Sequence, residues 1–233
     1  MSGFRPFEET AVPGPRRDLI GYGRHVPSKP LPKGGRVAVS FVINYEEGSE
    51  YAHPNGDGRN DGMTESLYAM DPQYRDLCAE SVYEYGSRVG IWRLERLFSS
   101  RGIPLTFFAS AVALERNREV AAWIVEKGHE PCSHGWRWEE VWKLDRDEEA
   151  DHIRRAIASF EETCGQRPLG WYCRYGASVN TRELLVEEGG FEYDSDAYND
   201  DLPYWVTGSG KEHLVVPYSA TYNDARFSLL PSY

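Results

Sequence analysis

Two glutamates, Glu46 and Glu47, stand next to each other directly after a run of β-branched and apolar residues. Adjacent carboxylates at the end of a strand can share one reaction, because one can hold a proton or a cation while the other activates water. The simpler interpretation is a solvated acidic turn, since glutamates are mostly exposed in folded proteins. We take both residues as candidate catalytic groups.

A second polar cluster occupies residues 133–138, where two tryptophans follow His134. A histidine at a strand end can act as a general acid, as a metal ligand or as a partner for an oxyanion. The alternative is a structural histidine that hydrogen bonds hold within an aromatic cluster. We count His134 as the third candidate catalytic residue.

Three further polar residues stand at comparable positions. Arg174 lies among aromatic residues and could clamp a planar amide or a carboxylate, or stack on tyrosine at the surface. Asp196 follows a later predicted strand and could orient a basic group in the site. Arg88 begins a helix and could bind substrate or form a surface ion pair. We carry all three as candidate substrate-binding residues.

These clusters follow successive strands of an alternating β/α pattern. Apolar runs predict strands at residues 36–44, 103–110, 130–133, 169–172, 191–194 and 213–218. Helical spacing and caps predict helices at residues 89–98, 117–127, 145–164 and 180–188. The alternation indicates a parallel sheet with crossover helices, and the catalytic groups of a parallel barrel follow the carboxyl ends of its strands. We therefore expect the polar clusters to meet in one site.

Length and composition fit a single domain with an extended arm. The chain has 233 residues, of which 40% are apolar and 27% are charged, as in ordinary globular proteins. Residues 1–34 are rich in proline, glycine and arginine, and we expect an arm that wraps the domain. Residues 35–233 form the domain itself. Its long polar loop at residues 48–76 is typical of functional or disordered segments.

Charge and cysteine placement argue against several classes of protein. A net charge of −11 disfavours binding to nucleic acid or anionic lipid. No stretch approaches the roughly 18 apolar residues of a membrane span, and residues 1–15 lack the apolar run of a secretory signal. The four cysteines are scattered and form no Cys-x-x-Cys pair, which argues against a structural zinc site or a disulfide framework. These features predict a cytoplasmic protein.

Three motifs resemble those of the polysaccharide deacetylase superfamily. They are Tyr45-Glu46-Glu47-Gly48, His134-Gly135-Trp136-Arg137-Trp138 and Tyr172-Cys173-Arg174-Tyr175-Gly176. The resemblance implies an α/β fold, an irregular (β/α) barrel. It also implies that the first acid of the first motif is the general base and the second is a metal ligand, although the family normally has aspartates there.

Further strings resemble one branch of that superfamily, the cofactor-independent allantoinases of purine and urate catabolism. They lie at residues 17–23 (RDLIGYG), 84–88 (EYGSR) and 202–205 (LPYW). The resemblance runs from about residue 16 to the end of the chain. It implies a hydrolase that acts on carbon–nitrogen bonds other than peptide bonds.

One departure from the superfamily bears on the metal. Trp138 stands where a metal-binding histidine would stand, and its indole N–H is a donor only. Glu47 and His134 alone make a poor site, because catalytic zinc usually has three protein ligands. We therefore expect no cofactor, with zinc or another divalent ion on Glu47 and His134 as the alternative.

The resemblance implies ring opening of a cyclic ureide as the reaction. Glu46 would activate water, His134 would stabilise the oxyanion or protonate the leaving nitrogen, and Glu47 would orient water or His134. A flat heterocycle would need aromatic walls and donors to its carbonyl groups. The candidate substrate-binding residues are Trp138, Tyr172 and Trp205 as walls, Arg88 and Arg174 as donors, and Asp196.

Two alternative functions stay open. One is a metal-dependent N-acetyl sugar deacetylase of carbohydrate metabolism, acting on chitin or peptidoglycan through an open groove. The other is a truncated, non-catalytic domain, because the family normally has further barrel units and the chain ends at Tyr233 before them. We therefore expect a barrel whose last units are missing. Its exposed apolar edges would favour a homo-oligomer.

Overall fold

The computed structural model describes residues 10–28, 31–62 and 70–228, and the chain divides into two compact units, Met1–Ala38 and Val39–Tyr233. The described part of the first unit is an extended chain with a short 3-10 helix, η1 (Pro32–Gly34). A hydrogen-bonded turn stands earlier in this unit, where Asp18 accepts from the backbone N–H groups of Ile20 and Gly21. Neither an α-helix nor a strand occurs in the described residues of this unit.

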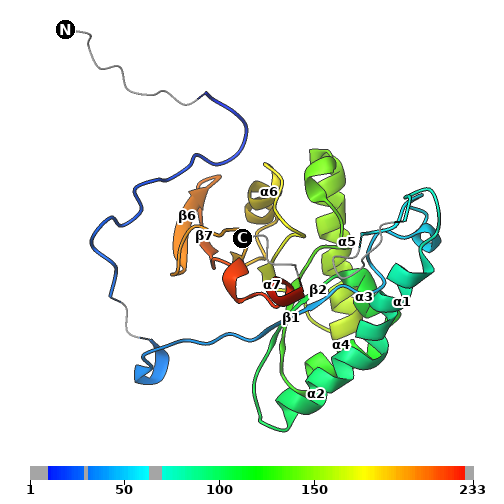
Figure 1. The fold of residues 1–233 in the computed structure, drawn as a ribbon. Coiled ribbons are helices and arrows are strands. Elements are labelled where there is room, and N and C mark those ends of the chain that lie inside the picture. The colour runs from blue at the N-terminus through cyan, green and yellow to red at the C-terminus, as the bar shows by residue number, and fades with distance from the viewer. Residues whose placement is uncertain (1–9, 29–30, 63–69, 229–233) are drawn as a thin grey trace. The chain divides into compact units, whose positions relative to one another are not determined.

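A seven-stranded sheet forms the frame of the second unit, in the order β1-β2-β3-β4-β5-β7-β6 (Figure 1). The strands are β1 (Val42–Tyr45), β2 (Thr106–Ala109), β3 (Glu130–Ser133), β4 (Gly170–Trp171), β5 (Tyr193–Asp194), β6 (Tyr204–Gly208) and β7 (Lys211–Val215). All neighbouring strands are parallel except β6 and β7, which form an antiparallel hairpin. The predicted α/β class with a mostly parallel sheet is therefore confirmed, and the sheet is not closed into a barrel.

Helices connect the parallel strands. They are α1 (Leu77–Tyr85), the π-helical turn η3 (Gly86–Gly90), α2 (Ile91–Ser99), α3 (Ala111–Arg116), α4 (Arg118–Glu126), α5 (Arg146–Cys164), α6 (Thr181–Glu188) and α7 (Ala225–Ser228). Three short 3-10 helices lie in the loops of this unit, namely η2 (His53–Asn55), η4 (Val141–Lys143) and η5 (Ala220–Tyr222). The long helix α5 begins at a capping box of Asp145 and Glu148 and ends at Gly165 in the left-handed conformation, as predicted.

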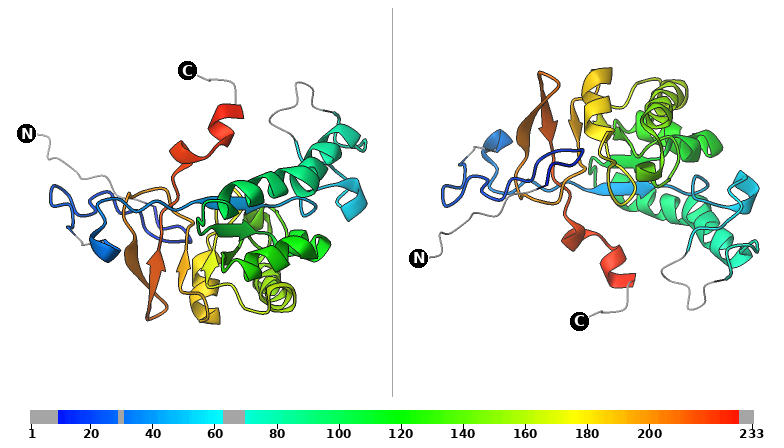
Figure 2. Two further views of the ribbon diagram at one scale, coloured as in Figure 1. Left: turned by 90° about the horizontal axis from the view of Figure 1, so that it is seen from below. Right: turned by 90° about the horizontal axis from the view of Figure 1, so that it is seen from above.

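The apolar core lies where these helices cover the sheet. Phe107, Leu114, Ile124, Phe160 and Leu185 have no exposed surface at all. Helices α3 and α4 both pack against α5, and Figure 2 shows these helices beside the β1–β4 part of the sheet, with the β6–β7 hairpin at its other end. No helix in the described part of the chain is long and apolar enough to cross a membrane.

The sheet differs from the prediction at two places: one expected strand is shorter, and one strand was not expected. The strand expected at residues 36–44 is short, because only Val42–Tyr45 pairs with β2 and Val39 upstream is 70% exposed. In β1 itself, exposed and buried residues alternate, so the strand is covered on one face only. Strand β6 was not expected. It reverses into β7 through Ser209 and Gly210, which both have positive φ as in a two-residue hairpin turn.

Candidate active site

The carboxyl ends of β1 and β3 bring the first two candidate residues together. The parallel register places Tyr45 of β1 level with Ala109 of β2, and Ala109 level with Ser133 of β3. Glu46 and His134 each follow their strand by one residue. Glu46 Oε1 lies 3.0 Å from His134 Nε2. The sequence-based expectation that these two residues meet at one edge of the sheet agrees with this contact.

The hydrogen bond on the far side of the imidazole fixes its tautomer. His134 Nδ1 lies 2.7 Å from the carbonyl oxygen of Tyr172, which can only accept, so Nδ1 carries a proton. In the neutral ring, Nε2 would then have a lone pair facing the carboxyl group of Glu46. Glu46 and His134 therefore share one proton, as a carboxylic acid with a neutral imidazole or as a carboxylate with an imidazolium.

The pair is held in an ordered, largely dry environment. The His134 ring is 2% exposed and stacks on Tyr172 with 5.0 Å between the ring centroids. Glu46 Oε1 also accepts a hydrogen bond from Asn44 Nδ2 at 3.1 Å. Both described hydrogen bonds to this carboxyl group are on Oε1, so Oε2 is the oxygen positioned to take a proton from water.

Glu47 makes no described hydrogen bond to His134, and its carboxyl group contacts the turn after β1 instead. Glu47 Oε2 accepts from the backbone N–H of Glu46 at 3.1 Å. Its carboxyl group packs against Gly86, where a Cβ atom would lie 2.0 Å from Glu47 Oε1. Burial is the main cause that raises the pKa of Glu47 to about 7, and the charge of Glu46 adds to it. Glu47 thus braces the backbone that carries Glu46.

The π-helical turn η3 is tied to the end of β1. Tyr45 Oη and Ser87 Oγ are 2.8 Å apart, and Asn117 Nδ2 donates to Ser87 Oγ at 3.0 Å. Asn117 precedes α4, but its side chain makes no cap hydrogen bond to that helix and holds η3 instead. These contacts explain why residues 84–88 form part of the site region although they are distant from it in sequence.

A cavity of about 360 Å³ opens beside Glu47. Its lining includes Glu50, Tyr83, Arg88 and Arg116 but neither Glu46 nor His134. Arg88 is 75% exposed along its side chain and pairs with Glu84 at 3.3 Å. Arg88 is therefore on the cavity wall and has no described contact with the Glu46–His134 pair.

Arg174 is buried, both of its Nη atoms are engaged, and its buried Nε has no hydrogen-bond partner among the described residues. Its Nη1 donates to Asp61 Oδ2 at 3.0 Å and to the Trp138 carbonyl oxygen at 3.0 Å, and Nη2 also bonds to Asp61. The guanidinium carbon lies 3.7 Å from the centroid of the Trp138 ring. Arg174 thus fixes Trp138 in place, and both of its Nη atoms are held by Asp61 or the Trp138 carbonyl. Asp61 had no signal in the sequence beyond its place in a long polar loop.

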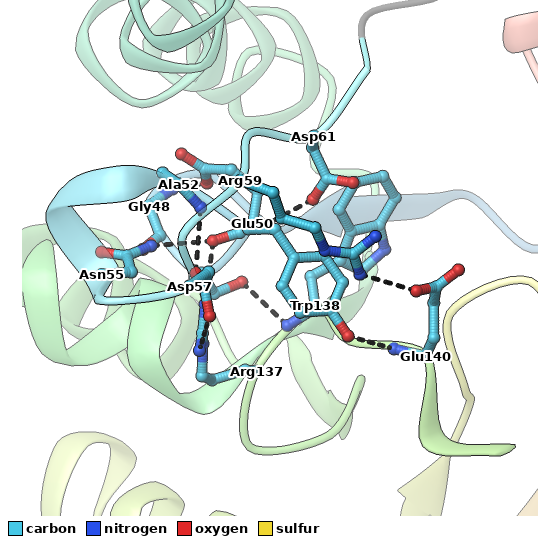
Figure 3. A network of polar contacts seen from close by, with 12 residues as sticks. Gly48, Glu50, Ala52, Asn55, Asp57, Arg59, Asp61, Arg137, Trp138 and Glu140 are labelled. Carbon is cyan, nitrogen blue, oxygen red and sulfur yellow. Dashed lines mark hydrogen bonds and ion pairs between the residues drawn. The ribbon is translucent and has the colours of Figure 1, made fainter. Parts of the chain in front are cut away.

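The loop at residues 48–61 is bound to the segment after His134 by a network of charged contacts (Figure 3). Arg137 makes two hydrogen bonds to Asp57, at 2.8 and 2.7 Å, and Arg59 donates to Glu140 at 2.7 Å. Burial acts to raise the pKa of Asp57, but the hydrogen bonds from Arg137 and the Ala52 N–H, together with the charges of Arg137 and Arg59, outweigh it, so the pKa is lowered. The network keeps the long loop ordered over the carboxyl ends of β1 and β3.

Two aspartates after β5 have opposite environments. Burial acts to raise the pKa of Asp194, but Arg182 at 2.6 and 2.8 Å and His213 at 3.1 Å outweigh it, so the pKa is lowered. Asp196 has no such partner, and burial followed by the charge of Asp194 raises its pKa to about 7. Asp196 Oδ1 accepts from the backbone N–H of Cys173 at 2.8 Å. The two carboxyl groups therefore differ in charge around neutral pH.

The two remaining candidate walls lie in different places. Tyr172 is buried, stacks on His134 and places its hydroxyl 2.8 Å from that of Tyr198. Trp205 lies on the outer hairpin strand β6 and is 59% exposed. Among the described rings, Trp205 has no aromatic contact with His134 or Tyr172, so the structure does not bring it to them.

The residues do not fit the divalent ion that the superfamily resemblance implies. The described residues contain no group of three or more His, Cys, Asp or Glu side chains that could hold a metal. Both nitrogens of His134 are engaged, one by Tyr172 and one by Glu46, while Glu47 faces Gly86. We therefore derive no step through a metal.

Comparison with known proteins agrees with this architecture. Residues 76–193 match the family model described as polysaccharide deacetylase. A protein of Schizosaccharomyces pombe, provisionally named a polysaccharide deacetylase, is 35% identical over 93% of this chain and 74% of its own.

Two solved structures are similar over nearly the whole chain. The structure of Puue allantoinase is 46% identical, with a TM-score of 0.87, and the match covers 93% of this chain and 73% of that one. A Pseudomonas aeruginosa PAO1 protein, provisionally described as a polysaccharide deacetylase, is 47% identical with the same TM-score and the same coverage. On this evidence the chain belongs to the polysaccharide deacetylase family, whose members hydrolyse carbon–nitrogen bonds.

Proposed function

We propose that this protein opens the ring of a cyclic ureide, with allantoin as the substrate. The observation that carries the proposal is the 3.0 Å contact between Glu46 and His134, with the histidine tautomer fixed by Tyr172. In this proposal, Glu46 supplies the base and the adjacent His134 imidazolium supplies the positive charge, without a metal. The similarity to an allantoinase over 93% of the chain supports the choice of substrate.

The reaction begins from the carboxylate–imidazolium form of the pair. Glu46 Oε2 takes a proton from a water molecule as the water oxygen adds to a ring carbonyl carbon. The positive charge of His134 offsets the negative charge that develops on the carbonyl oxygen. When the tetrahedral adduct collapses, the ring carbon–nitrogen bond breaks, and the nitrogen takes the proton that Glu46 had accepted. Atoms and charges balance with water as the only co-reactant.

Aromatic faces would position a flat substrate beside this pair. Tyr172 already stacks on both His134 and Tyr218, so Trp138, whose ring Arg174 holds by contact with its face, is the aromatic wall in this proposal. Such rigid rings bind a planar heterocycle at low entropic cost. Arg88 lines the neighbouring cavity, and in this proposal it would donate to a carbonyl group of a substrate that extends into that cavity.

The second candidate is hydrolysis of the N-acetyl group of a sugar. The names of two of the similar proteins favour it. That reaction needs a divalent ion, for which the described donor set is inadequate.

A substrate comparison tests the proposal against this alternative. The purified protein is incubated with allantoin, and separately with an acetylated chito-oligomer and added zinc. Allantoate formation without acetate release is the expected result. Acetate release from the chito-oligomer with no change in allantoin would overturn the proposal and establish the deacetylase.

A further inference from the structure

One peptide group lies between His134 and Asp196. The carbonyl oxygen of Tyr172 accepts from His134 Nδ1 at 2.7 Å, and the N–H of Cys173 donates to Asp196 Oδ1 at 2.8 Å. This carbonyl and this N–H belong to the same peptide bond, and in a trans peptide they point in opposite directions. A continuous hydrogen-bonded chain therefore runs from Glu46 through His134 and the peptide to Asp196.

Asp196 has no other evident structural task. Its Oδ2 atom is buried and accepts no hydrogen bond from the described residues. The neighbouring cation, Arg182, is paired with Asp194 and meets only the backbone oxygen of Asp196. An unpaired buried acceptor is costly to a protein, so its retention points to a function.

We infer that Asp196 is a positioning residue, which holds the proton on His134 Nδ1 by polarising the Tyr172–Cys173 peptide. Hydrogen bonds in a chain strengthen one another, so negative charge at the N–H end makes the carbonyl oxygen a stronger acceptor. The ring is then held in the orientation that presents Nε2 to Glu46. The inference rests on the proposed function only in giving His134 a catalytic role.

The coupling depends on pH through the charge of Asp196. Burial and Asp194 raise the pKa of Asp196 to about 7, so its carboxyl group is neutral below this pH and charged above it. The titratable and charged groups around it are Asp194, His134, Cys132, Cys173, Tyr172, Tyr198 and Arg182. The peptide is therefore polarised most strongly above about pH 7.

Nuclear magnetic resonance of the substrate-free protein tests the coupling directly. The Nδ1 proton of His134, assigned by its loss in His134→Gln, should move downfield as the pH rises through about 7. In Asp196→Asn, an amide oxygen can still accept from the Cys173 N–H, but the negative charge is absent. The His134 Nδ1 proton should then lie upfield of its wild-type position at high pH and should not shift as the pH rises through about 7. Asp201→Asn removes an exposed charge five residues further along and should behave like wild type.

Activity gives the second readout. Asp196→Asn should lower kcat about tenfold, which is the size that lost support of a functional histidine often has. It should leave KM nearly unchanged and remove the rise of kcat through about pH 7. A wild-type Nδ1 proton that does not respond between about pH 6 and pH 8 overturns the inference, whether or not Asp196→Asn folds. A normal proton response in a protein that does not open allantoin supports the coupling and overturns the proposed function.

Discussion

At the residue scale, the hydrogen bond from His134 to the Tyr172 carbonyl decides what the opposite ring nitrogen can do. With Nδ1 protonated, Nε2 either receives a proton from Glu46 or holds one against its carboxylate. A histidine free to rotate would offer no such constraint. The Tyr172 carbonyl oxygen, which follows β4, therefore determines which protonation states the Glu46–His134 pair can adopt.

Replacement of the proposed base gives the first prediction. Glu46→Gln keeps the size of the side chain but cannot accept a proton from water, so kcat for ring opening should fall about 10²- to 10⁴-fold with little change in KM. Steady-state kinetics measures both constants. Glu126→Gln, at an exposed position near the end of α4, is the matched control. Turnover of Glu46→Gln at the level of that control would refute the assignment.

The buried carboxyl group of Glu47 gives a prediction about stability. Burial raises its pKa from 4.5 to about 7, so the folded protein holds this proton more tightly than the unfolded chain does. The free energy of unfolding therefore falls by about 3 kcal/mol from this group as pH rises through that window. Glu47→Gln keeps an acceptor for the Glu46 N–H without titrating. The free energy of unfolding of Glu47→Gln, measured relative to wild type, should therefore increase by about 3 kcal/mol between low and high pH.

Urea unfolding of both proteins at about pH 5 and about pH 8 measures this difference. Other titrating groups are common to the two proteins and cancel in the comparison. A difference between variant and wild type that is the same at both pH values would show that Glu47 does not titrate as described.

The sequence predicts contacts between residues that directly follow strands, but it does not predict contacts that depend on loops. Glu46 and His134 each stand one position beyond a predicted strand, so the parallel register alone brings them together. The Arg174–Asp61 pair joins residues 113 positions apart, through a loop without periodic pattern. No rule of spacing could have shown that Asp61 would bind the Nη atoms of Arg174.

At the element scale, the π-helical turn η3 is shaped by what it packs against. Gly86 must be a glycine because the Glu47 carboxyl group occupies the space of a side chain. Gly90, at the other end of η3, has only ordinary contacts, the nearest being the Tyr85 carbonyl oxygen at 3.7 Å from a built Cβ. A methyl group at Gly86 would therefore overlap Glu47, whereas a methyl group at Gly90 would make only ordinary van der Waals contacts.

Alanine substitutions at Gly86 and Gly90 offer a matched test of the packing of this turn. Gly86→Ala should destabilise the protein by about 1–3 kcal/mol, since an overpacked contact must be relieved by displacing Glu47. Gly90→Ala should be neutral or stabilising by up to about 1 kcal/mol, because alanine has less freedom to lose in a helix. Thermal or urea unfolding measures both. Equal effects of the two substitutions would contradict the packing of Glu47 on Gly86.

Elements with strong local signals were predictable, and elements defined by their neighbours were not. Helix α5 carries a capping box and a glycine stop, and β3 agrees with its predicted bounds. By contrast, β1 is shorter than its apolar run, because a partner strand lies on one side only. The hairpin strand β6 depends on pairing with β7 and has no helical or alternating signal of its own.

At the scale of the whole molecule, the residues of the hydrogen-bonded chain from Glu46 to Asp196 come from the carboxyl ends of the parallel strands. Glu46 follows β1, His134 follows β3, and Asp196 follows β5, with the Tyr172–Cys173 peptide after β4 between them. The described residues of this acidic chain contain no group of three or more His, Cys, Asp or Glu side chains that could hold a metal. Under the proposed function, the proton-sharing pair of Glu46 and His134 would carry out the reaction.

The measurement that tests this account most directly is the rate of allantoin ring opening by the purified protein before and after treatment with a strong chelator. The account predicts that allantoate forms at the same rate in both samples, because Glu46 and His134 supply the base and the charge. Loss of activity on chelation, restored by added zinc, would contradict it and assign the chemistry to a metal.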